Sequence, residues 1–225
     1  MRLARLLVLL ALGLAVPACG GGDDEGSDDA AGTGAGTTQA AEGGCETVDA
    51  PAPKQDGGQT APDDPLDAET TYRLTFETTC GDFTVTLDQA SAPATTASLV
   101  ALARDGFYDG TVFHRVVPGF VIQGGDPTGT GTGGPGYSTV DVPPPGAAYT
   151  QGVVAMAKGP TDPPGTSGSQ FFVVTGPDIG LPPEYAVVGT VTDGLPTVQA
   201  IEALGVGDAP PSKPVVVERV TVEEG

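Results

Sequence analysis

The sequence is poor in the residues that bind metals and nucleic acids. Its 225 residues contain one histidine, three cysteines and no tryptophan, which leaves too few nitrogen and sulfur ligands for most zinc sites. Nine basic residues stand against 29 acidic residues, so the formal net charge is −20, and the basic residues form no run. Binding to nucleic acid through phosphate neutralisation is therefore excluded. We expect no metal, no cofactor and no nucleic-acid partner.

The motifs that would indicate nucleotide or hydrolase chemistry are incomplete. Residues 129–134 have the glycine spacing of a dinucleotide-binding loop, but Pro135 follows where that motif needs a helix. His114 is the sole imidazole of the sequence, and no nucleophile-elbow sequence surrounds Ser167 or Ser169. We therefore interpret the glycines as a surface loop and His114 as a hydrogen-bonded structural residue in a strand.

Residues 1–18 have the parts of a lipoprotein signal peptide. Two arginines precede an apolar stretch, residues 6–16, and a Val-Pro-Ala triplet then leads to Cys19. The stretch is shorter than the roughly 20 residues of a membrane-spanning helix. The triplet and Cys19 resemble a bacterial lipobox, whose cysteine is lipidated, although an ordinary signal cleavage that leaves Cys19 free is the alternative. We expect an exported protein that is anchored to the outer face of the cell membrane through this lipid only.

Residues 19–70 have the composition of a flexible tether. After Cys19 there are 13 acidic residues, a single basic residue, Lys54, and no aromatic residue up to position 70. Such a segment cannot bury enough apolar surface to offset the loss of chain entropy on ordering. We therefore expect an acidic, disordered tether in front of a folded domain at residues 71–225.

Two cysteines remain if Cys19 carries a lipid. Cys45 lies in the expected tether and Cys80 in the domain. In an exported protein such a pair is a candidate for a disulfide, and two free thiols are the alternative.

The domain at 71–225 has the pattern of a mainly β protein. Short apolar or alternating runs recur between glycine, proline and aspartate residues, as in an antiparallel sandwich or barrel. The eight runs are 72–79, 83–87, 112–117, 120–122, 153–157, 171–175, 186–191 and 215–222. Residues 93–105 and 196–204 instead have apolar side chains at helical spacing, with a proline near each start and a glycine after each end.

Arg115 lies in a run that is otherwise apolar, where a charged side chain needs a partner or a path to the surface. It belongs to the sequence Phe-His-Arg-Val-Val-Pro-Gly-Phe-Val-Ile-Gln-Gly-Gly-Asp at 113–126. Further segments are Phe-Tyr-Asp-Gly at 107–110, Met-Ala at 156–157, Gly-Ser-Gln-Phe-Phe at 168–172 and Tyr-Ala-Val-Val-Gly at 185–189. In sequence and in order these segments resemble those of the cyclophilins, a family of peptidyl-prolyl isomerases.

The resemblance implies an eight-stranded antiparallel barrel closed by two helices, and it implies a role for each matching residue. Arg115 corresponds to the catalytic arginine of the family. The apolar pocket for the substrate proline corresponds to Phe120, Val121, Phe172 and Leu181, and contacts with the peptide are implied for Gln123, Ala157, Gln170 and Tyr185. Phe113 and Phe171 are expected in the core. The family also has a tryptophan where this chain has Gly180, an asparagine where it has Lys158 and often a histidine at Tyr185.

Two functions follow from the resemblance. The chain is either an active isomerase that helps exported or surface proteins to fold, or a module that binds proline-containing segments without important turnover. In both cases the partners are proline-containing polypeptides, and single-domain cyclophilins are commonly monomers. A purely structural surface protein has only the tether in its favour.

Overall fold

The computed structural model describes residues 44–225, so the expected signal peptide, Cys19 and the first part of the expected tether lie outside the described residues. The described part contains eleven strands and two helices. The strands are β1 (Tyr72–Thr78), β2 (Gly81–Leu87), β3 (Thr111–Val112), β4 (Arg115–Val117), β5 (Val121–Gly124), β6 (Thr139–Val140), β7 (Val153–Met156), β8 (Thr166–Ser167), β9 (Phe171–Val174), β10 (Val187–Asp193) and β11 (Val216–Glu224). The helices are α1 (Pro93–Arg104) and α2 (Leu195–Glu202).

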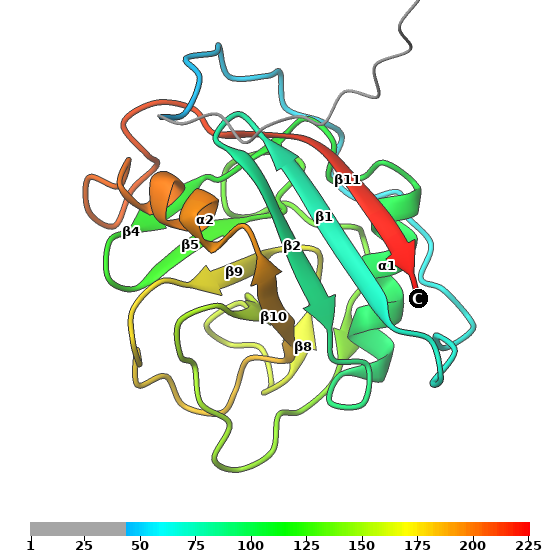
Figure 1. Ribbon diagram of the computed structural model, residues 1–225. Helices are drawn as coiled ribbons and strands as arrows, with labels where there is room; N and C mark the ends of the chain where they lie inside the picture. The colour runs from blue at the N-terminus through cyan, green and yellow to red at the C-terminus, as the bar shows by residue number, and fades with distance from the viewer. Residues whose placement is uncertain (1–43) are drawn as a thin grey trace, which may run out of the picture. The chain divides into compact units, whose positions relative to one another are not determined.

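Nine strands form one antiparallel sheet in the order β3-β11-β1-β2-β10-β7-β9-β5-β4, and β6 pairs with β8. Figure 1 shows β11, β1 and β2 side by side. β3 and β4 lie at opposite ends of this order although only Phe113 and His114 separate them in sequence. The sheet must therefore curl until its two ends approach, and a bridge joins Val112 of β3 to Asp126, which lies two residues after β5.

The mainly β fold with two helices is confirmed, with two differences in detail. The run expected at 112–117 is split into β3 and β4, because β3 pairs with β11 whereas β4 pairs with β5. The short pair β6–β8 was not predicted, since each strand has only two residues and shows no alternation. The sheet therefore has nine strands where eight were expected.

The strands of the curled sheet bury side chains on both faces. In β9, Phe171 and Val173 belong to the main core, whereas Phe172 and Val174 belong to a second apolar cluster on the opposite face. β7 alternates in the same way, which explains why both strands are apolar throughout. Phe171 thus lies in the core, as expected. The second cluster forms the base of the site described below.

The two helices pack their apolar faces against the curled sheet. α1 begins at Pro93, which suits the first helical turn because its missing N–H has no partner there. α2 begins after Gly194, whose φ of +74° is left-handed. A Cβ at that glycine would lie 2.2 Å from the carbonyl oxygen of Asp82, so no larger residue fits. Neither helix of residues 44–225 has the length and apolar character needed to cross a membrane.

Residues 45–59, which we name the strap, differ from the flexible tether expected from their composition. The strap lies along the domain through backbone hydrogen bonds from Lys54 to Pro127, from Gly57 to Gly134 and from Gln59 to Pro135, of 2.8, 2.9 and 2.9 Å. The Lys54 ammonium donates to the carbonyl oxygens of Gly106, Phe107 and Asp109 at 3.0, 2.7 and 3.0 Å. The composition argument failed here because polar and backbone bonds, and not apolar burial, hold the segment.

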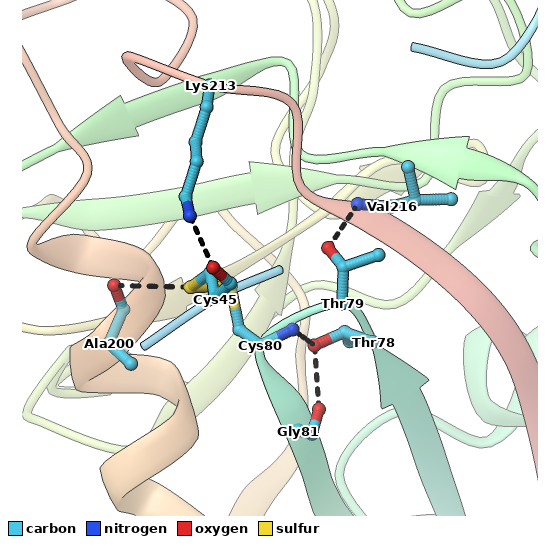
Figure 2. The surroundings of a disulfide bond; sticks show 8 residues. All are labelled: Cys45, Thr78, Thr79, Cys80, Gly81, Ala200, Lys213 and Val216. Carbon is cyan, nitrogen blue, oxygen red and sulfur yellow. Dashed lines mark hydrogen bonds between the residues drawn. A yellow bond between two sulfur atoms is a disulfide. The ribbon is translucent and has the colours of Figure 1, made fainter. Parts of the chain in front are cut away.

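A disulfide joins Cys45 at the start of the strap to Cys80, the pair suggested by the sequence. Cys80 lies in the turn between β1 and β2, as Figure 2 shows. The Lys213 ammonium donates to the carbonyl oxygen of Cys45, and the Glu46 N–H donates to that of Thr79 at 2.7 Å. The strap is therefore attached at this end by a covalent bond as well as by hydrogen bonds.

Candidate active site

A cavity of about 290 Å³ opens at the ends of β4, β5, β7 and β9. Its lining residues are Arg115, Phe120, Val121, Gln123, Ala157, Lys158, Phe172, Leu181 and Tyr185. We name this cavity the ring pocket, because it contains the residues expected to receive a proline ring. Five of the nine lining residues are apolar and four carry polar or charged groups, a combination that can bind a small apolar group and fix its orientation.

The base of the ring pocket is the second apolar cluster. Val121 and Phe172 are 2% and 4% exposed and come from the neighbouring strands β5 and β9, whose register pairs Gln123 with Phe172. Phe120 and Leu181 are partly buried and pack against the same cluster. Because this cluster lies on the outer face of the curled sheet, the pocket has a firm apolar floor and an open mouth.

Arg115 brings a permanent positive charge to the mouth of the pocket. Its register partner in β5 is Gln123, and its Nη1 donates to Gln123 Oε1 at 3.3 Å. The guanidinium carbon lies 5.7 Å from the centre of the Phe120 ring, a cation–π distance. On its other edge, Nε and Nη2 donate to the two carboxylate oxygens of Asp208 at 2.5 and 3.2 Å. These bonds lower the pKa of Asp208, first through the hydrogen bonds and then through the charge of Arg115.

Hydrogen bonds continue from Arg115 into a second, larger cavity. Gln123 Nε2 donates to Gln170 Oε1 at 3.1 Å, and Gln170 Nε2 donates to the Gly133 carbonyl oxygen at 2.9 Å. The second cavity, of about 820 Å³, shares Gln123, Ala157 and Lys158 with the ring pocket. Asp56 of the strap lines it and accepts a hydrogen bond from the Gly134 N–H at 2.9 Å. A peptide in the ring pocket therefore has room for neighbouring residues beside it.

The glycine loop at 129–134 is organised by Asp126. The Asp126 carboxylate accepts hydrogen bonds from the N–H groups of Thr128, Gly131 and Gly133, at 2.7, 2.5 and 3.1 Å. Burial alone would raise its pKa, but the bonds from Thr128, Gly133 and Gly131 stabilise the charged form and lower it. Residues 131–134 of the loop form a wall of the second cavity. They lie in a loop that no helix follows, as the sequence predicted.

His114 does not have the hydrogen bonds expected of a structural histidine. It is buried, at 9% exposure, and neither ring nitrogen has a hydrogen-bond partner among the described residues. Burial lowers its pKa, Asp126 opposes this shift and Arg115 adds to it. The prediction was wrong because the backbone of β3 and β4 turns the ring under the glycine loop, where a Cβ on Gly131 would lie 3.7 Å from its Cδ2.

Two residues that the sequence reasoning missed, Tyr149 and Glu184, bond to lining residues of the ring pocket. Tyr149, which belongs to no strand, donates from its hydroxyl to the Tyr185 carbonyl oxygen at 2.7 Å and accepts from the Tyr185 N–H at 3.0 Å. The Lys158 side chain is only 6% exposed and pairs with Glu184 at 3.1 Å. Tyr149 and Glu184 lie in irregular segments, where alternation gives no signal.

The structure brings the sequence-predicted site residues together. Eight of the nine line the ring pocket, and Gln170 lies beside it in the second cavity. Asp208 was not predicted, since it lies 93 positions from Arg115 in a polar loop. Within residues 44–225, no group of three or more His, Cys, Asp or Glu side chains is arranged to hold a metal.

The domain is a curled antiparallel sheet with a partly apolar pocket that has an arginine at its mouth, and comparison with known proteins identifies its family. Residues 73–222 match the family model described as cyclophilin type peptidyl-prolyl cis-trans isomerase. The chain is 39% identical over 171 residues to peptidyl-prolyl cis-trans isomerase A of Mycobacterium tuberculosis, covering 68% of this chain and 92% of that protein. It is 40% identical over 176 residues to isomerase B of Streptomyces anulatus, covering 69% and 98%.

Comparison with solved structures leads to the same family. A cyclophilin type isomerase of Cryptosporidium parvum superposes with a TM-score of 0.63 at 30% identity, covering 69% of this chain and 99% of that one. A structure of the same protein in the presence of the dipeptide Ala-Pro gives a TM-score of 0.63 at 31% identity, covering 68% and 99%. The chain belongs to the cyclophilin-type peptidyl-prolyl cis-trans isomerases, enzymes that catalyse rotation about the bond before proline. The strap lies outside the matched residues.

Proposed function

We propose that Arg115 catalyses this rotation on a proline held in the ring pocket, in proline-containing segments of exported or surface proteins. The observation that carries the proposal is the guanidinium at the mouth of an apolar pocket of about 290 Å³. The Cryptosporidium relative, solved in the presence of Ala-Pro, supports a proline-containing ligand for this chain too.

The chemistry explains why an arginine suffices. Resonance in the amide gives a barrier to rotation of about 18–20 kcal/mol, and no covalent bond has to be made or broken. As the bond twists, resonance is lost and the lone pair of the prolyl nitrogen becomes a hydrogen-bond acceptor. A guanidinium N–H that donates to this lone pair stabilises the twisted state more than the planar one, as a catalytic contact must.

The expected contribution of Arg115 is one to two powers of ten in rate. A hydrogen bond to a charged group contributes about 1.5–3 kcal/mol, and each tenfold change corresponds to about 1.4 kcal/mol. The remaining acceleration comes from Phe120, Val121, Phe172 and Leu181, which hold the proline ring still while the preceding carbonyl turns. In this proposal Gln123, Ala157 and Gln170, which lie where the two cavities adjoin, bind the peptide backbone.

The test is cis–trans exchange of an Ala-Pro peptide, followed by NMR with the full chain kept in a mild detergent. We expect acceleration by the wild type and a loss of about ten- to hundredfold in Arg115→Ala. Arg219→Ala is the matched control, because Arg219 pairs with Glu77 on the strands β11 and β1 and lines neither cavity. Peptide binding without acceleration by the wild type would indicate the alternative, a module that binds proline-containing segments.

The proposal includes an exported, monomeric protein anchored to the outer face of the membrane through lipid on Cys19. The signal-like residues 1–18 support it, and so does the Cys45–Cys80 disulfide, since such bonds persist in oxidising compartments. Cys19→Ser should move the protein from the membrane fraction to the soluble fraction. A wild-type chain that is found in the soluble fraction would contradict the anchor without affecting the isomerase proposal.

A further inference from the structure

Asp208 makes the closest side-chain contact of Arg115 outside the ring pocket. Its carboxylate binds the Nε and Nη2 edge of the guanidinium with both oxygens, at 2.5 and 3.2 Å. The mechanism above assigns no part to this carboxylate, and it does not line the ring pocket. A two-oxygen contact of this kind fixes the plane of the guanidinium as well as its position.

The backbone around Asp208 is held in place independently of the ion pair. The Val116 N–H, next to Arg115 in β4, donates to the Ala209 carbonyl oxygen at 3.0 Å, so the loop is bonded to the same strand that carries the arginine. The Ser212 N–H donates to the Leu204 carbonyl oxygen at 2.8 Å and closes the loop onto the end of α2. The loop that carries Asp208 is therefore fixed at both points, so its carboxylate lies beside the guanidinium without depending on the ion pair.

We propose that Asp208 is a positioning residue that orders the Arg115 guanidinium before substrate binds. This inference rests on the proposed function of Arg115. Asp208 engages the Nε donor and one Nη2 donor, and Gln123 engages one Nη1 donor. One N–H on each Nη nitrogen is left without a partner among these side chains. The two contacts thus fix the orientation of the guanidinium and leave these two donors for the prolyl nitrogen.

The geometry favours positioning over suppression of the arginine's charge. The Asp208 side chain is 70% exposed and that of Arg115 is 30% exposed, so water screens their attraction and little of the positive charge is lost to the pair. An arginine side chain that is free to rotate would have to be ordered during each turnover, which opposes the reaction. Asp208 removes that requirement, since the side chain is already held.

The experiment compares Asp208→Ala and Asp208→Asn with wild type in the full chain, using peptide isomerisation rates over a range of peptide concentrations. We expect Asp208→Ala to lower kcat about three- to tenfold, the effect of releasing one side chain with many rotamers, while KM changes less than about twofold. Asp208→Asn keeps one acceptor oxygen and should recover part of the loss. Asp193→Ala, which removes a carboxylate from an exposed position at the end of β10, should match wild type.

A second measurement reports on order directly. The Nε–H resonance of Arg115, assigned with Arg115→Lys, should have the heteronuclear NOE of a rigid group in wild type and of a mobile group in Asp208→Ala. The inference is overturned if Asp208→Ala is as fast as wild type or faster, if its loss lies in KM alone, or if the Arg115 resonance stays rigid. An inactive wild type, or an Arg115→Ala variant as active as wild type, would instead overturn the proposed function.

Discussion

Removing the Cys45–Cys80 disulfide should lower the free energy of unfolding of the full chain by about 4 kcal/mol. The two cysteines are 35 positions apart, and the chain-entropy relation for a cross-linked loop of that length gives about 4 kcal/mol at 25 °C. The effect acts on the unfolded chain, whose freedom the cross-link restricts. The hydrogen bonds of the strap, such as those of Lys54, do not involve the sulfur atoms and should persist in the folded variants.

The measurement is urea unfolding followed by circular dichroism for Cys45→Ser, Cys80→Ser and the double variant. All three should lose the same free energy, because either change removes the same cross-link, and a reductant should bring wild type to their level. Neither cysteine lines the ring pocket or the second cavity, so isomerase activity at 25 °C should stay close to that of wild type. The reasoning is refuted if the single variants lose less than about 1 kcal/mol or if their losses add in the double variant.

Three further predictions concern His114, Lys54 and Phe120. Burial lowers the pKa of His114 below its usual 6.5, so the unfolded chain takes up a proton first as the pH falls, and stability should decrease from about pH 6.5 down to the folded-state pKa. Because His114 is the sole histidine of the sequence, urea unfolding across this pH range should lose that step in His114→Leu, and an unchanged pH dependence would contradict the assignment. Lys54→Met leaves three carbonyl oxygens without their ammonium donor. We expect the free energy of unfolding to fall by about 1–3 kcal/mol and amide hydrogen exchange at Gly57 and Gln59 to become faster. Unchanged exchange would show that the backbone bonds alone hold the strap. Phe120→Ala removes one apolar wall of the ring pocket and should raise KM about tenfold and also lower kcat, because the proline ring is held less firmly; initial rates at several peptide concentrations measure both, and an unchanged kcat would contradict this role of Phe120.

The sequence predicts the parts of the site that lie on strands. Arg115, Val121 and Phe172 lie on β4, β5 and β9, where short apolar or alternating runs identify the strand and the motif identifies the residue. The register of β4 with β5 and of β5 with β9 then brings these residues to one cavity. For such residues, the local sequence pattern and the tertiary structure lead to the same assignment to a strand and to the site.

Features formed between irregular segments could not be predicted in this way. Asp208 reaches Arg115 from a loop with no periodicity, and the strap binds through backbone groups that carry no residue-specific signal. Lys54 offered the one indication, as a single basic residue in an acidic segment, since its ammonium needs acceptors and finds them in the turn after α1. The composition of the segment predicted a disordered tether, because composition does not show which partner surface is available.

The position of the disulfide determines how the domain would respond to a mechanical pull from its N-terminal side. A force applied to residues that precede Cys45 passes through the sulfur–sulfur bond directly to Cys80, in the turn between β1 and β2. Residues 46–71, which lie between Cys45 and β1, are then bypassed by the load. The strap and its contact with the second cavity would therefore remain in place under tension, and the β1–β2 turn would be the point at which the load enters the sheet.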